Sequence, residues 1–186
     1  MPQRRVRYLG DPVLRKKSAP IKKVSIDIRT LIKDMFETMD ANYGQGLAAP
    51  QVGVLKRVIV VDSQHDEEEE RRRFALINPK IKSYFGEREG MDEGCLSIPG
   101  VYGPVIRAFG AHVDYQDEKG RKKKIEAKGM LARCIQHEID HLNGILFFDH
   151  SNTPEKQMIS EMEQFLAEQE EIEKATASTE TEESDS

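Results

Sequence analysis

Apolar side chains recur at helical spacing in three parts of the chain. Residues 25–42 predict an amphipathic helix, with Ser25 as its N-cap. Residues 130–144 predict a second helix, because good helix formers fill this stretch and neither Pro nor Gly interrupts it before a terminal glycine. A third helix is predicted over about 153–174. Its apolar face contains Met158, Met162, Phe165 and Leu166.

Short runs rich in β-branched and aromatic residues predict strands on both sides of the second helix. Before this helix they occupy residues 57–62, 74–79 with a continuation over 80–84, 105–108, 111–115 and 123–127. Residues 116–120 predict a hairpin turn, and residues 145–149 predict a short apolar strand after the helix. Together these elements predict an α+β fold, in which antiparallel β-sheets pack around a central buried helix.

Charged residues are concentrated in two segments of the chain. Residues 65–73, a block of acids followed by bases, predict a solvated connection between two strands. Residues 175–186 are rich in Ser, Thr, Glu and Asp and lack core formers, so they predict a disordered acidic tail. Because no linker or repeat interrupts the rest, residues 1–174 are expected to form a single domain.

Composition excludes several classes of function. The chain has 186 residues and a net charge of −5, and no long basic stretch gives a footprint for nucleic acid. No apolar run approaches the length of a membrane span, and the basic N-terminus lacks the hydrophobic segment of a secretory signal. Two cysteines in different contexts do not suggest a disulfide framework, so we expect a cytoplasmic protein with reduced thiols and no membrane partner.

The second helix carries a pattern typical of metal sites, because His137, Glu138 and His141 form H-E-x-x-H. Four residues advance about 400° along a helix, so the two imidazoles lie about 40° apart and one turn along the axis. They can bind one metal ion, with Glu138 placed to take a proton from a water held there. Histidines at this spacing also occur on surface helices without function, but the apolar neighbours indicate burial, where unpaired imidazoles would be costly.

A third ligand must come from elsewhere, and the two cysteines are the candidates. Cys134 lies seven residues before His141, a helical rise of about 10.5 Å, whereas ligand atoms lie about 2.0–2.3 Å from a metal. Cys95 follows a glycine on a separate turn and has no such limit. The geometry therefore favours Cys95, His137 and His141 as the ligands.

Three ordered motifs of this chain resemble those of peptide deformylases. They are G-x-G-L-A-A-P-Q at residues 44–51, E-G-C-L-S at 93–97 and Q-H-E-x-D-H at 136–141. The D-P-x-L-R opening at 11–15 and the L-F-x-D exit at 146–149 are similar to the same family. The resemblance spans about residues 8–150 and is specific, since H-E-x-x-H alone occurs in several classes of hydrolase.

The resemblance implies a catalytic domain that removes the N-formyl group from nascent polypeptides beginning with formyl-methionine and releases formate. It implies one divalent metal ion per chain at Cys95, His137 and His141, with Fe2+ favoured and Zn2+, Ni2+ or Co2+ able to bind. It assigns proton transfer to Glu138, and stabilisation of the oxyanion to the Gln51 amide and the Leu96 backbone N–H. Nascent peptides are the implied partners, which leaves room for a transient contact with the ribosome.

Substrate binding is also implied by the resemblance. Gly46 would expose backbone for strand-like pairing with the peptide, and Met91, Met130 and Cys134 would line the pocket for methionine. One departure from the family pattern is Gln45, which stands where an aliphatic residue is usual. It leaves the motif chemistry intact but changes the expected lining of the pocket.

Two other hypotheses remain open at this point. A metallopeptidase would take its third ligand after the helix, where Asp149 and His150 are available. A metal-stabilised binding module would need neither Glu138 nor Gln51, so their presence favours an enzyme.

Overall fold

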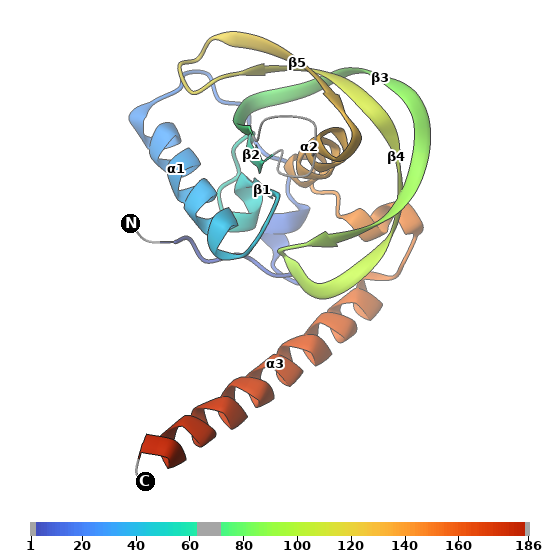
Figure 1. Ribbon diagram of the computed structural model, residues 1–186. Coiled ribbons are helices and arrows are strands. Elements are labelled where there is room, and N and C mark those ends of the chain that lie inside the picture. The colour runs from blue at the N-terminus through green and yellow to red at the C-terminus, as the bar shows by residue number, and fades with distance from the viewer. Residues whose placement is uncertain (1–2, 63–71, 185–186) are drawn as a thin grey trace.

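The computed structural model describes residues 3–62 and 72–184, with side chains described as far as residue 174. Of the connection predicted at residues 65–73, residues 65–71 lie outside the described residues. The described elements form a mixed helical and antiparallel β fold (Figure 1). No helix in the described ranges combines the length and the apolar character needed to span a bilayer.

One five-stranded antiparallel sheet contains all the strands that the structure describes, where the sequence predicted more than one sheet. The strand order follows the chain, and the strands are β1 (Gly46–Ala48), β2 (Val58–Asp62), β3 (Arg73–Cys95), β4 (Ile98–Gln116) and β5 (Lys122–Lys128). The pairing of β3 with β4 shifts register at several points, and such irregularities bend a strand. The two long strands therefore curve around the helix α2 (Gly129–Leu142), as Figure 1 shows.

Two helices cover opposite faces of the sheet, and β2 shows why. Its residues are all buried, with Val58 and Val60 facing one cluster and Ile59 and Val61 facing the other. The first cluster contains α1 (Ile26–Ala41), whose first turn is capped by Ser25. The second contains the apolar face of α2, so the sequence periodicity predicted both helices and their buried sides.

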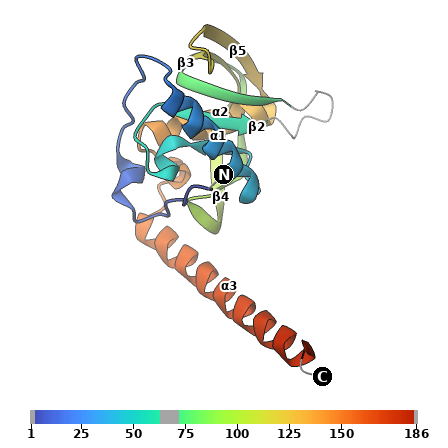
Figure 2. The same cartoon turned by 90° about the vertical axis from the view of Figure 1, so that its left-hand side faces the viewer.

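The remaining helix, α3 (Glu155–Ser184), has its buried side chains, among those described, in its first turns, and the helix then projects away from the sheet (Figures 1 and 2). Met158 and Met162 are buried against residues of the β3–β4 hairpin and of the segment before α3. The backbone is helical to Ser184, beyond the predicted end near residue 174 and through most of the segment predicted to be disordered. The division of the chain into a domain at 1–174 and a tail stays a prediction.

Two local predictions were wrong. The separate strands at 105–108 and 111–115 belong to one strand, β4, because the backbone continues its pairing through Gly110. Residues 145–149 are not a strand, since a short 3-10 helix occupies Phe147–Ser151. The Asp149 carboxylate accepts a hydrogen bond from the Leu146 N–H at 2.8 Å and turns the chain at that point.

Candidate metal centre

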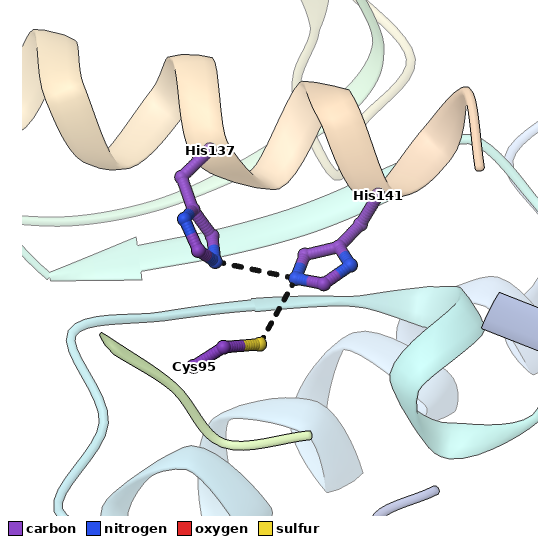
Figure 3. A group of neighbouring side chains, drawn as sticks. All are labelled: Cys95, His137 and His141. Atoms are coloured by element: carbon purple, nitrogen blue, oxygen red, sulfur yellow. Dashed lines mark hydrogen bonds between the residues drawn. The ribbon is translucent and has the colours of Figure 1, made fainter. Parts of the chain in front are cut away.

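Three side chains from two elements meet in the interior. His137 and His141 project from α2, and Cys95 lies at the end of β3 (Figure 3). Nε2 of His141 lies 3.2 Å from Cys95 Sγ and 3.2 Å from Nε2 of His137. The ligand atoms of the three residues all lie within 4.8 Å of one another. The structure thus brings together the three residues that the sequence predicted as metal ligands.

The spacing and chemistry of this group fit a divalent metal ion. Tetrahedral ligands at about 2.0–2.3 Å from a metal stand about 3.3–3.6 Å apart. The two 3.2 Å separations at His141 Nε2 are close to this spacing. The pKa shifts of the two histidines are opposite: burial and the charge of His137 lower the pKa of His141, whereas at His137 the hydrogen bonds with Cys95 and Glu93 outweigh burial and raise the pKa well above its usual value. A metal ion binds neutral imidazole, so it would displace a proton from His137. Two nitrogens and one sulfur suit zinc and several transition metals.

The other candidate ligands lie outside this group. Cys134 donates its thiol toward the Gln45 carbonyl at 3.5 Å, and burial raises the pKa of this thiol well above its usual value. Asp149 accepts hydrogen bonds from Arg15 and from the Leu146 backbone. His150 Nε2 lies 2.8 Å from Asp140 Oδ2. Asp149 and His150, the candidates for the third ligand of a metallopeptidase, therefore make other contacts.

A buried carboxylate orients one of the histidines. Oε2 of Glu93 lies 2.9 Å from Nδ1 of His137, which leaves Nε2 of that ring facing Cys95 and His141. Arg107 and Arg133 donate to the same carboxylate at 2.6–2.9 Å. Burial acts to raise the pKa of Glu93, but the hydrogen bonds from His137 and Arg107 outweigh it and hold that pKa well below its usual range.

Asp140 extends this network on the outer side of α2. It accepts a hydrogen bond from Arg107 at 2.8 Å, so it pairs with a basic neighbour rather than with a ligand histidine. Arg107 is itself buried and bridges Glu93 to Asp140. The position of His137 is thus fixed through Glu93 by a charged network that includes residues of β3, β4 and α2.

Glu138 has the environment expected of a proton-transfer group. Burial outweighs the neighbouring positive charges and raises the pKa of its carboxyl to about 7. Its Oε2 atom is buried and has no hydrogen-bond partner among the described residues, yet the side chain lines a pocket. This oxygen is available to a molecule that enters the pocket.

Gly46 leaves the space that Glu138 occupies. A Cβ atom on Gly46 would stand 2.5 Å from Glu138 Oε1 and 2.6 Å from Cys134 Sγ. The sequence predicted exposed backbone at Gly46, but the residue is buried and lets β1 approach α2 closely. As the first strand in the sheet order, β1 still has one edge that no other described strand pairs.

Gln51 is buried beside the group of Cys95, His137 and His141. Its side-chain oxygen accepts the Ala48 N–H at 2.7 Å, which directs the amide nitrogen toward Ser97 Oγ at 3.2 Å and Cys95 Sγ at 3.5 Å. Leu96 follows Cys95 in the turn between β3 and β4 and also lines the pocket. The two groups predicted to stabilise an oxyanion therefore lie next to Cys95.

A pocket of about 570 Å³ opens beside this centre. Its lining includes Cys95, His137 and Glu138 together with Met130, Cys134 and Gln45. Met91, predicted to belong to it, is absent from the lining and is 43% exposed on β3. Gln45, the polar residue at a position that is usually aliphatic in the family that this chain resembles, thus lines the pocket.

Sequence reasoning missed several residues of the site. Glu93 stood within a motif, but nothing in its spacing indicated that it would contact His137 across 44 positions of sequence. Arg107 and Arg133 carried no signal beyond their charge. Phe165, assigned to the core face of its helix, lines the pocket.

Comparison with known proteins agrees with this geometry. The profile of the family described as polypeptide deformylase matches residues 3–157. A peptide deformylase of Picosynechococcus is 51% identical over 148 residues, covering 80% of this chain and 79% of that protein. The structure resembles a crystal structure of peptide deformylase from Ehrlichia chaffeensis with a TM-score of 0.81 and 37% identity, covering 90% and 97% of the two chains. It also resembles a crystal structure of the Ehrlichia chaffeensis peptide deformylase in complex with actinonin, with a TM-score of 0.80 and 38% identity. That comparison covers 90% of this chain and 98% of the other.

Proposed function

Because the chain belongs to the peptide deformylase family, we propose that it hydrolyses the formamide of nascent polypeptides that begin with formyl-methionine. The products are formate and a polypeptide with a free amino terminus. The chain is a hydrolase of that family, and the proposal adds a role for each residue of the site. The observation that carries it is the group of Cys95, His137 and His141 with Glu138 beside it in one pocket.

The proposed ligands of a divalent ion are Cys95, His137 and His141. When bound there, such an ion supplies a Lewis acid that lowers the pKa of water and polarises the formyl oxygen. Glu93 orients His137 through the 2.9 Å hydrogen bond, and the Cys95 thiolate offsets one unit of the ion's charge. We favour Fe2+ on the family resemblance, while Zn2+, Ni2+ and Co2+ suit the same ligands.

Glu138 is the proposed proton carrier. Its carboxylate takes a proton from the attacking water and gives it to the departing amine, which leaves poorly unless it is protonated. A pKa near 7 suits both steps, because the group must accept and release a proton at similar pH. The unpaired Oε2 oxygen supports this role, since it is free to accept a hydrogen bond within the pocket.

Two donors are proposed to stabilise the tetrahedral oxyanion. The Gln51 amide nitrogen is held toward Cys95 by the bond between its side-chain oxygen and the Ala48 N–H. The Leu96 backbone N–H follows Cys95 directly in the chain. Fixed donors aimed at a developing negative charge lower the barrier without reorganisation during the reaction.

The peptide is proposed to pair with the free edge of β1 at Gly46. Its methionine side chain would enter the apolar part of the pocket at Met130 and Cys134, with Gln45 as a polar neighbour. Since the substrates are nascent chains, we extend the proposal to a cytoplasmic location and a transient contact with the ribosome.

The proposal is tested by incubating anaerobically purified protein, with its metal content measured, with a formyl-Met peptide. We expect formate to accumulate and the peptide bonds to remain intact. Cleavage of internal peptide bonds would instead support a metallopeptidase. Metal-loaded protein that releases no formate would support the binding-module alternative.

A further inference from the structure

The helix α3 contributes a side chain to the pocket, although most of this helix lies beyond the residues 3–157 that match the family profile. That side chain is Phe165. We propose that Phe165 is a specificity-determining residue that contacts an apolar or aromatic side chain just after the methionine of the peptide. This inference rests on the proposed function.

Phe165 is held in place by the anchored part of its helix. Met158 and Met162 lie seven and three positions before it, on the same helix face, and both are buried. They pack with Ile98 and Val101 of β4 in one apolar cluster. The start of α3 is fixed by Glu155, which accepts a hydrogen bond from Arg15 at 2.6 Å.

The ring of Phe165 lies directly on the backbone of Gly100. A Cβ atom on Gly100 would stand 2.1–2.6 Å from three atoms of the ring, so only glycine allows this contact. Gly100 also has a φ of +76°, a conformation that favours glycine. The hairpin that bears Cys95 therefore meets the C-terminal helix at this point.

A second aromatic ring occupies a matching place on the same hairpin. Tyr102 covers Gly94, where an added Cβ would stand 2.6 Å from a ring carbon. Both rings line the pocket, together with Pro99 between the two glycines. The β4 side of the pocket thus presents apolar and aromatic surface, which suits an apolar or aromatic side chain.

The position of this surface determines which part of the peptide it meets. The formyl group must reach Cys95 and Glu138, and the methionine is proposed to enter beside Met130 and Cys134 of α2. Phe165 belongs to neither of these groups, and it flanks the pocket on the β4 side. It is therefore placed for the second or third residue of the peptide and acts on binding rather than on the chemical step.

The test uses metal-loaded wild-type protein and Phe165→Ala with formyl-Met-Ala-Ala, formyl-Met-Phe-Ala and formyl-Met-Ala-Phe. For wild type we expect a lower KM with at least one phenylalanine peptide than with formyl-Met-Ala-Ala. In Phe165→Ala this advantage should be lost, through a rise in KM of about fivefold for that peptide, the scale of one aromatic contact. The kcat values should not change, and activity on the dipeptide formyl-Met-Ala should stay within twofold.

Two control variants distinguish loss of the contact between Phe165 and the peptide from a general loss of stability. Phe165→Tyr keeps the ring and should retain the preference, while Ile172→Ala removes an apolar side chain that is 58% exposed on the same helix and should change nothing. An unchanged preference in Phe165→Ala, or an equal loss on all four peptides, would overturn the inference. Absence of formate from wild type with every peptide would contradict the proposed function itself, and the inference with it.

Discussion

Replacing Gly46 by alanine is the sharpest test of how β1 and α2 fit together. The added Cβ would stand 2.5 Å from Glu138 Oε1, 2.6 Å from Cys134 Sγ and 2.9 Å from Glu138 Cγ. Ordinary contact begins near 3.4 Å, so the Glu138 carboxylate must withdraw by about 0.9 Å. The backbone of β1 cannot easily move away from Glu138, because Gly46 pairs with Val61 in the sheet and β1 packs against α2.

The expected cost has two parts. Overpacking a buried site lowers the free energy of unfolding by about 1–3 kcal/mol, which corresponds to a fall of roughly 2–12 °C in melting temperature for a chain of this size. A displacement of about 1 Å at a catalytic group can lower turnover by about 10²-fold. We therefore expect Gly46→Ala to bind metal normally, melt earlier and release formate about 10²-fold more slowly.

The assay combines metal stoichiometry, thermal unfolding and the rate of formate release. Gly90→Ala is the matched control, because a Cβ on that strand glycine would meet its nearest neighbour at 3.9 Å, so stability and rate should change little. In a Glu138→Ala background, Gly46→Ala should destabilise the protein less than it does in wild type. Equal destabilisation in both backgrounds, or full turnover in Gly46→Ala, would refute the steric reasoning.

Four further predictions concern Glu138, Gln51, the two cysteines and the C-terminal segment. Glu138→Gln should keep the metal and lose at least about 10²-fold in kcat, and near-normal turnover at full occupancy would exclude the proton-transfer role. Gln51→Ala should lower kcat more than it raises KM, with a lower melting temperature because the buried Ala48 N–H loses its acceptor; an effect confined to KM would limit Gln51 to substrate positioning. Cys95→Ser should retain far less metal than Cys134→Ser when both are purified without oxygen, and equal retention would contradict the ligand assignment. Deleting residues 175–186 should leave activity and melting temperature nearly unchanged, whereas a fall of several degrees would show that the segment contributes to stability.

The parts of the fold that follow from local pattern were predictable from the sequence. The helix at Gly129–Leu142 was expected because its formers and its apolar period agree, and its two histidines had to share a face. The choice between Cys95 and Cys134 followed from the rise of a helix, and the structure brings Cys95 to the histidines. Both conclusions need only the geometry of one helix: which residues share a face, and how far apart along the axis two of its residues lie.

The remaining features depend on contacts between distant segments. Glu93 meets His137, and Phe165 meets Gly100, through pairings that no periodicity encodes. Residues 145–149 are apolar enough for a strand, but a single side-chain contact from Asp149 to the Leu146 backbone favours a 3-10 turn. A local pattern indicates which residues are buried, and it does not indicate which partner buries them.

The order of the strands has a consequence for how the protein folds. Each strand pairs with its neighbour in the chain, so the sheet can grow by successive hairpins with short loop closures. The proposed metal ligands are different, because Cys95 and His141 are 46 positions apart and belong to separate elements. The complete group of three therefore exists only where α2 lies against the end of β3, and no single hairpin contains it. An ion bound at these three residues would therefore stabilise the contact between α2 and the sheet rather than any single hairpin.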